Sequence, residues 1–221
     1  MTKKEKAYDV VMRLPVIAFD LFFLVHEILG MRDVVALHPY FGGDWSFLVT
    51  LAARVSVVIF LAVSVCFHIA RYRPVSKYAT WYPKLTALAG MLFANLILLI
   101  PRATPDPLWD SASTFLIMTG TIISTLVIFD LGRSLSVMPE ARKLVTSGFY
   151  RYVRHPLYLA AEVGVFGIFL QFRSWQGLLI LAVHFYFQIR RMDWEEGILV
   201  KTFPDYVGYK SGTYRLFPRL Y

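Results

Sequence analysis

Four apolar stretches, each about as long as a membrane-spanning helix, occupy most of the first 129 residues of the chain. They run over residues Val10–Leu29, Phe47–Ile69, Trp81–Ile100 and Ser111–Phe129. Each is close to the ~20 residues that a helix needs to cross the hydrocarbon core of a bilayer. A cleaved signal peptide is a poor interpretation of the first stretch, because Asp20 interrupts it and large residues follow. We therefore predict four retained transmembrane helices.

Two shorter apolar stretches follow in the second half of the chain. Leu157–Phe172 and Trp175–Ile189 are separated only by Arg173 and Ser174, so they form either two short tilted spans or a hairpin that dips into the bilayer. Helix is favoured in both cases, because backbone groups at membrane depth must be hydrogen-bonded internally. The predicted fold is all-α, a polytopic transmembrane helix bundle with about six membrane segments, the last two a short helical hairpin. With no internal repeat, we expect a single integral membrane domain over 1–221, in which 1–129 holds four spans and 130–221 most of the polar residues.

Composition and charge agree with a membrane protein. Hydrophobic residues make up 57% of the chain and charged residues 17%, against about 45–50% and roughly 25% in an ordinary soluble domain. If the N-terminus is cytoplasmic and all six segments cross, most of the 23 Lys and Arg residues fall in cytoplasmic loops. Such an excess is typical of cytoplasmic loops. The pattern predicts a multi-pass protein with both termini in the cytoplasm, and it accounts for the net charge of +8 without a nucleic-acid partner.

Several common cofactor motifs are missing from the sequence. The five histidines show no H-E-x-x-H or other zinc spacing, and Cys66 is the single cysteine. Neither G-x-G-x-x-G nor a P-loop occurs, and there is no G-x-S-x-G elbow. We therefore expect no metal site, no Rossmann nucleotide site and no hydrolase nucleophile.

A cluster of polar residues precedes the fifth apolar stretch. The loop ends in Thr146-Ser147-Gly148-Phe149-Tyr150 and is followed by Arg154-His155-Pro156-Leu157-Tyr158. Pro156 suits the first turn of a helix, where its missing N–H is not needed. The N-terminus of that helix would favour an anionic group through its free N–H groups and its dipole. The alternative interpretation is that His155 only caps the helix.

A second polar group lies along the last apolar stretch and its continuation. His184, Gln188, Arg191 and Glu195 are spaced by four, three and four residues, so one face of a continuous helix would carry them all. They could form a functional site, or His184, Gln188 and Arg191 could be contacts between helices. A solvated charged run where the helix leaves the membrane is the alternative for Arg190, Arg191, Asp193, Glu195 and Glu196. Glu162 lies in the preceding apolar stretch, and an ionisable residue inside a span suggests a functional site. A structural ion pair between Glu162 and Arg54 is the alternative.

The combination of R-H-P-x-Y, an apolar hairpin and the Glu195-Glu196 pair resembles the isoprenylcysteine carboxyl methyltransferase and phospholipid methyltransferase superfamily of membrane enzymes. The resemblance covers about residues 130–221. It implies methyl transfer from S-adenosylmethionine, at the cytoplasmic membrane face, to a lipophilic or small acceptor (a carboxylate, an amine or a thiol). Membrane lipid is the expected surrounding and a possible source of the acceptor.

The resemblance also implies roles for individual residues. The residues that it assigns to the cofactor are Lys143, Leu144, Val145, Tyr150, His155, Pro156, Leu157, Tyr158 and Glu195. Arg191 matches the arginine that faces the acceptor in the carboxyl methyltransferases. For catalysis, Arg191 could hold an acceptor carboxylate, or Glu196 could take a proton from an amine or a thiol. The chain departs from the family at Ala160, where a glycine is common.

Two other functions fit parts of the same pattern. A membrane reductase of the sterol-reductase type has a related C-terminal architecture and would use NADPH. It would need basic residues for the 2′-phosphate of that cofactor, and the Glu195-Glu196 pair is less natural beside such a group. A non-enzymatic lipid-binding or transport protein could keep buried charges such as Arg54 and Glu162, but it would not need R-H-P-x-Y together with the acidic pair.

Overall fold

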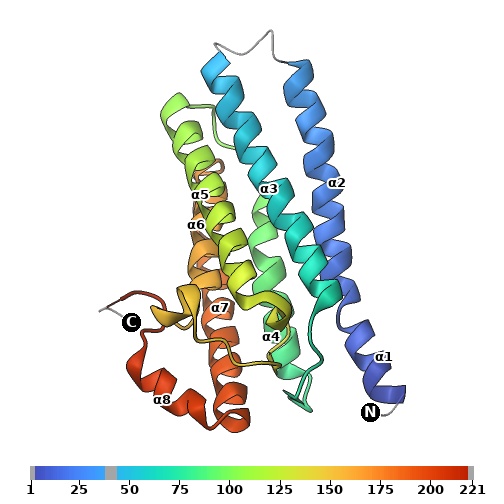
Figure 1. The fold of residues 1–221 in the computed structure, drawn as a ribbon. Coiled ribbons are helices and arrows are strands. Elements are labelled where there is room, and N and C mark those ends of the chain that lie inside the picture. Colours follow the sequence, from blue (N-terminus) through green and yellow to red (C-terminus); the bar gives the residue numbers. More distant parts are fainter. Residues whose placement is uncertain (1–2, 38–43, 219–221) are drawn as a thin grey trace.

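Helices provide nearly all of the regular structure in the computed structural model, which describes residues 3–37 and 44–218 (Figure 1). The α-helices are α1 (Lys3–Val11), α2 (Leu14–Ala36), α3 (Asp44–Ala70), α4 (Tyr82–Leu92), α5 (Pro107–Leu131), α6 (Pro156–Leu170), α7 (Trp175–Thr202) and α8 (Asp205–Gly212). Short 3₁₀ helices are η2 (Phe93–Leu99), η3 (Gly132–Ser134) and η4 (Gly148–Arg151). Two-residue strands β1 (Ser76–Lys77) and β2 (Glu140–Ala141) pair antiparallel, with Ser76 opposite Ala141. The prediction of an all-α protein is confirmed.

Four helical stretches within the described residues are long and apolar enough to cross a membrane. They are Ala7–Ala36, Trp45–Ala70, Tyr82–Leu99 and Pro107–Ser134, and they match the four predicted spans. The protein is therefore a multi-pass integral membrane protein. The first stretch is interrupted after Val11, and α2 restarts at Leu14 with Pro15 in its first turn, because proline cannot donate a backbone hydrogen bond within a helix.

The third span changes its helix type halfway. It begins as α4 and continues from Phe93 as the 3₁₀ helix η2. A 3₁₀ run of seven residues is unusually long for this conformation. The sequence contains no proline between Pro83 and Pro101 that would have predicted the change.

The predicted hairpin is present as α6 and α7, joined by Gln171–Ser174. Helix α6 has 15 residues, about 22 Å at 1.5 Å per residue, and is shorter than the ~30 Å hydrocarbon core. Helix α7 has 28 residues and continues without a break to Thr202, before Pro204, as its proline-free pattern predicts. Whether these two helices cross or re-enter stays a prediction.

The long helices α2, α3 and α5 run side by side, and α6 packs closely on α5 (Figure 1). Glycine makes the α5–α6 contact possible. A Cβ built on Gly120 would lie 2.5 Å from the backbone N of Gly164 and 2.9 Å from the carbonyl oxygen of Ala160. Small residues of this kind allow the backbones of membrane helices to approach each other.

Charged residues join the N-terminal helix to the loops at one end of the bundle, where α1 and α8 lie (Figure 1). Asp9 accepts from Arg71 Nη2 at 3.1 Å, and its other contacts include Arg142 Nη2 at 3.5 Å. Arg142 also pairs with Glu140 at 2.6 Å, and the hydroxyl of Tyr8 donates to Glu140 at 3.0 Å. This network and the β1–β2 pair fix the loop that leads to α6.

The proposed ion pair between Arg54 and Glu162 is wrong. Arg54 Nη1 lies 2.9 Å from Glu27 Oε2, so it joins α3 to α2. Glu162 instead contacts His184 of α7. The sequence could not distinguish the two acidic partners, because both lie within apolar stretches.

Candidate functional site

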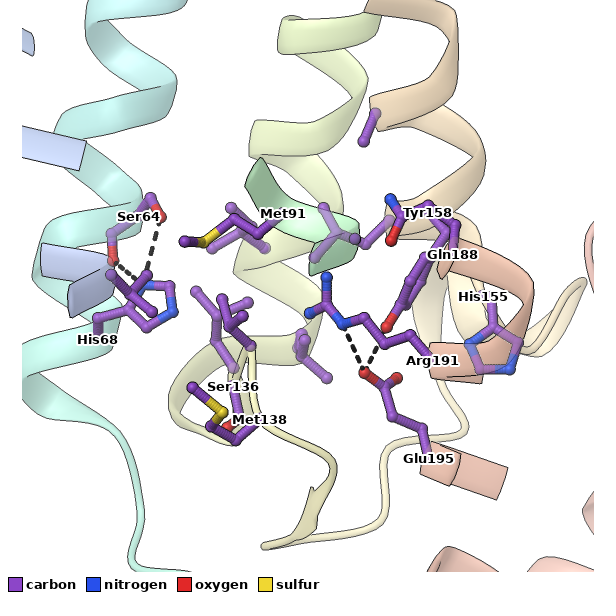
Figure 2. A pocket seen from close by; sticks show the side chains of 18 of the residues that line it. Ser64, His68, Met91, Ser136, Met138, His155, Tyr158, Gln188, Arg191 and Glu195 are labelled. Atoms are coloured by element: carbon purple, nitrogen blue, oxygen red, sulfur yellow. Dashed lines mark hydrogen bonds and ion pairs between the residues drawn. The ribbon is translucent and has the colours of Figure 1, made fainter. Parts of the chain in front are cut away.

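A cavity of about 390 Å³ lies inside the bundle, between the α6–α7 hairpin and the N-terminal helices (Figure 2). Its size falls within the usual range of small-molecule sites, about 300–1,000 Å³. The predicted site residues that line it are Lys143, Leu144, Val145 and Tyr150 from the loop, His155, Leu157 and Tyr158 from the start of α6, and Arg191 and Glu195 from α7. Pro156 and Glu196 are buried beside it but do not line it.

Helix α6 begins at the edge of this cavity. His155 is its N-cap residue and Pro156 its first residue, as the sequence predicts, but within 3–37 and 44–218 no side chain caps the free N–H groups of the first turn. Leu157 and Tyr158 of that turn line the cavity. The interpretation of His155 as a simple capping side chain is therefore wrong, and the N-terminus of α6 can receive an anionic group.

The C-terminal tail fixes the position of this helix start. The backbone N–H of Arg154 donates to the carbonyl oxygen of Tyr214 at 2.8 Å. The backbone N–H of His155 donates to the carbonyl oxygen of Arg215 at 3.1 Å. Val153 forms a parallel bridge with Tyr214. Sequence reasoning missed this pairing, because backbone hydrogen bonds between an irregular loop and a tail leave no side-chain pattern.

Glu196 is the centre of a cationic cluster. Its carboxylate lies 3.1 Å from His155 Nε2, 3.0 Å from Arg154 Nε, 2.8 Å from Lys210 Nζ and 3.3 Å from Arg215 Nε. Burial alone would raise its pKa, but the hydrogen bonds from His155, Lys210 and Arg154 outweigh burial and hold the pKa well below its usual range. A carboxylate in this state is a weak proton acceptor. The geometry gives Glu196 the role of holding α6, α7 and α8 together.

Glu195, the other member of the acidic pair, faces the cavity (Figure 2). The hydroxyl of Tyr158 donates to its carboxylate, and Arg191 Nε lies 3.3 Å from the same oxygen. The guanidinium carbon of Arg191 lies 4.9 Å from the centre of the Tyr158 ring, and His155 packs edge-on against that ring. The cavity therefore brings His155, Tyr158, Arg191 and Glu195 into one group.

The deeper part of the polar face of α7 contacts α6. His184 Nε2 lies 2.9 Å from Glu162 Oε1, and the amide nitrogen of Gln188 donates to the same oxygen at 3.1 Å. His184, Gln188, Arg191 and Glu195 all line the cavity, which confirms that they share one face. For His184 and Gln188 the interpretation as contacts between helices is confirmed as well.

The opposite wall of the cavity carries polar residues that the motifs did not indicate. Ser64 and His68 of α3 lie across the cavity from Arg191 and Tyr158, with Met91 and Met138 between the two walls (Figure 2). Asp20 of α2 lines the cavity as well and accepts from the hydroxyl of Ser64 at 2.7 Å. In the sequence Asp20 interrupts the first span, and an acidic residue inside a span is itself a functional signal.

The residues of the C-terminal wall fit S-adenosylmethionine. The uncapped start of α6 suits its carboxylate, and Glu195 suits its ammonium group or its ribose hydroxyls. The faces of Tyr150 and Tyr158 suit its sulfonium methyl group through cation–π attraction. Ala160 is buried against α5 and does not line the cavity, so its departure from the family's glycine leaves this wall unchanged. Among the described residues, His, Cys, Asp and Glu form no group of three or more that could hold a metal ion.

Comparison with known proteins gives a family and two relatives. The family model of phospholipid methyltransferases matches residues 109–206. The nickel-cobalt-cadmium resistance protein NccN of Alcaligenes xylosoxydans is 32% identical over 124 residues, 52% of this chain and 54% of that protein. The cobalt-zinc-cadmium resistance protein CzcN of Cupriavidus metallidurans is 29% identical over 167 residues, 74% of this chain and 61% of that protein. The chain thus spans between about half and three-fifths of the length of these relatives.

The matched range contains all of α6 and α7, nearly all of α5, and the loop between α5 and α6. These are the elements that form the C-terminal wall of the cavity and carry R-H-P-x-Y and the acidic pair. Residues 109–206 therefore match the phospholipid methyltransferase family, and the resemblance inferred from the motifs is confirmed.

Proposed function

We propose that the protein transfers a methyl group from S-adenosylmethionine to a lipophilic acceptor, at the membrane face where α1 and α8 lie. The observation that carries the proposal is the convergence of His155, Tyr158, Arg191 and Glu195 at the uncapped start of α6, on one cavity. The match of residues 109–206 to the phospholipid methyltransferases supports it. When bound, the cofactor would supply a methyl group activated by a positively charged sulfur.

The residues of this wall would act by binding and alignment. Lys143, Leu144 and Val145 of the loop would cover the cofactor on the side of the aqueous phase, and Tyr150, which is buried, would close the site beneath them. Glu195, held by Tyr158 and Arg191, has a fixed orientation before any ligand binds. Such pre-organisation matters for methyl transfer, because holding two reactants in line can supply about 7–11 kcal/mol of the barrier.

The apolar surroundings of the cavity suit a lipophilic acceptor. Phe19, Phe60, Leu61 and Ile97 line its N-terminal part, and the helices that carry them are exposed to the bilayer in a membrane-spanning bundle. We propose that the acceptor arrives from the lipid and that both termini lie in the cytoplasm, so the cofactor enters from the aqueous side.

Isothermal titration of the detergent-purified protein with S-adenosylhomocysteine and with NADPH tests the cofactor. We expect S-adenosylhomocysteine to bind and NADPH not to bind. His155→Ala and Glu195→Gln should abolish or strongly weaken binding, whereas His26→Gln, on the exposed face of α2, serves as a matched control. Binding of NADPH alone would favour the reductase, and binding of neither ligand would favour a lipid-binding protein.

The acceptor can be sought directly in membranes. The purified protein would be incubated with S-adenosylmethionine that carries a labelled methyl group and with a total membrane lipid extract. We expect label in the organic phase and none with Glu195→Gln. Identification of the labelled product by mass spectrometry would name the acceptor.

A further inference from the structure

We propose that His68 is the general base of this site, positioned by Ser64 and Asp20, and that the acceptor is therefore a protic nucleophile, a thiol or an amine, rather than a carboxylate. The inference rests on the proposed methyl transfer and concerns the wall of the cavity that lies outside R-H-P-x-Y and the acidic pair. In this assignment His68, and not Glu196, takes the proton, because the carboxylate of Glu196 is surrounded by cations.

The hydrogen bonds of His68 determine which ring nitrogen carries the proton. Its Nδ1 lies 2.9 Å from the carbonyl oxygen of Ser64. Since a carbonyl oxygen only accepts, Nδ1 must donate, and in the neutral ring Nε2 carries the lone pair. Nε2 is buried and has no hydrogen-bond partner among the residues that the structure describes, in a side chain that is 2% exposed and lines the cavity. A buried acceptor left without a partner is costly, and a ligand with an X–H group would satisfy it.

Asp20 stands behind the ring, on the side away from this lone pair. The hydroxyl of Ser64 donates to Asp20 Oδ2 at 2.7 Å and lies 3.3 Å from His68 Nδ1. The carboxylate itself is 3.8 Å from Nδ1. This arrangement orients the imidazole and stabilises its positive charge once Nε2 has taken a proton, which is the role of the acidic member in other catalytic His–carboxylate pairs.

The opposite wall argues against a carboxylate acceptor. Arg191 is the cation that could hold one, but its guanidinium already pairs with Glu195 at 3.3 Å. A carboxylate nucleophile also needs no base, because it has no proton to lose, so it would donate no hydrogen bond to the Nε2 lone pair of His68. A thiol or an amine donates an X–H group to Nε2 and fits both walls.

The transfer step balances with this assignment. The lone pair of the acceptor's sulfur or nitrogen forms a bond to the methyl carbon, and the bond from that carbon to the sulfonium sulfur breaks. The electron pair of the broken bond stays on the sulfur, which becomes a neutral thioether. The proton of the acceptor moves to Nε2 of His68, giving an imidazolium beside Asp20.

Three probes with the same twelve-carbon chain, dodecanethiol, dodecylamine and laurate, test the acceptor class. With labelled S-adenosylmethionine, we expect the wild-type protein to methylate the thiol or the amine and not laurate. His68→Gln should lower that rate by roughly 100-fold or more, as for loss of a general base, while its affinity for S-adenosylhomocysteine stays that of the wild type. Asp20→Asn should lower kcat by a smaller factor and leave the KM for the probe unchanged.

A chemical probe of the wild-type protein gives a second measurement that needs neither a variant nor turnover. Diethyl pyrocarbonate acylates imidazole nitrogens that carry a lone pair, and peptide mass spectrometry locates the product. With S-adenosylhomocysteine bound, we expect labelling of His68 that bound dodecanethiol prevents. His26, on the bilayer-facing surface of α2 and outside the cavity, should give the same labelling with and without the thiol.

Methylation of laurate alone or of none of the three probes would overturn the inference, as would a full rate in His68→Gln or no labelling of His68. The proposed function fails separately, if the wild-type protein binds no S-adenosylhomocysteine. The two failures are therefore distinguishable in the same preparation.

Discussion

Two adjacent carboxylates illustrate how neighbouring residues of one helix receive different tasks. Glu195 faces the cavity with Tyr158 and Arg191, whereas Glu196 is turned toward Arg154, His155, Lys210 and Arg215. Consecutive residues of an α-helix point about 100° apart, and here only Glu195 lines the cavity. The first carboxylate is available for a cofactor, and the second stabilises the structure around it.

Substitution of each glutamate by glutamine should separate these tasks. Glu196→Gln leaves a cluster of cations without its anion, and loss of one partner of a buried pair costs about 3–5 kcal/mol of stability. Because Lys210 is partly exposed, we expect a loss near the lower end of this range. We expect a melting temperature several degrees lower. Glu195→Gln should lower the melting temperature less, because Glu195 has fewer cationic partners, and should weaken S-adenosylhomocysteine binding by roughly 10–100-fold, because a hydrogen bond to a charged group contributes about 1.5–3 kcal/mol. Equal losses of stability in both variants would contradict this division.

The lowered pKa of Glu196 also predicts an acid-sensitive fold. Its carboxyl group binds a proton more weakly in the folded than in the unfolded protein, where its pKa is about 4.3. Its stabilising contribution is therefore complete above about pH 4.3 and is lost as the pH falls toward the folded-state value. Thermal melting between about pH 7 and pH 3 should show a steep loss of stability in the wild type and a shallower one in Glu196→Gln. Parallel curves would exclude this contribution.

At the scale of elements, the helices were largely predictable and their irregularities were not. The lengths of the apolar stretches predicted the four spans. The absence of proline after Trp175 predicted the full extent of α7. The spacing of His184, Gln188, Arg191 and Glu195 predicted their common face, because helical periodicity is a local property. The wall that carries Asp20 and His68 was missed, because its residues come from two helices whose pairing no local pattern encodes.

The contact between α5 and α6 depends on Gly120. In Gly120→Ala the new Cβ would meet the backbone of Gly164 and Ala160, and backbone cannot move aside as a flexible side chain can. We expect a loss of about 1–3 kcal/mol, as for other overpacked sites. Gly164→Ala is the matched control: its Cβ would have nothing within 4 Å, and loss of a helical glycine stabilises by about 0.5–1 kcal/mol. Thermal melting of both variants should give shifts of opposite sign. A lower melting temperature in Gly164→Ala would contradict the packing of α5 and α6 described here.

At the scale of the whole molecule, the site requires one orientation in the membrane. Helices α1 and α8, the loop before α6 and the start of α6 lie toward one end of the bundle, and the α6–α7 turn lies toward the other (Figure 1). The cofactor of the proposed function would have to reach the first of these ends, and the excess of Lys and Arg in the loops at this end predicts that this end faces the cytoplasm. The distribution of Lys and Arg along the sequence predicts the orientation of the bundle in the membrane. The depth of the α6–α7 hairpin depends on packing and lipid contacts, which the distribution of charge does not determine.

Cysteine accessibility tests this orientation. In a Cys66→Ser background, Ser211→Cys places a thiol on exposed α8, and Thr104→Cys places one at the opposite end, in the exposed turn before α5. In sealed right-side-out membrane vesicles, a membrane-impermeant maleimide should label position 104 at once and position 211 only after the vesicles are opened, because position 211 faces the lumen. Labelling of position 211 in intact vesicles would reverse the orientation and put the cofactor entrance outside the cytoplasm, where no S-adenosylmethionine is synthesised. Labelling of both positions only after opening would instead show that the turn before α5 does not reach the outer surface.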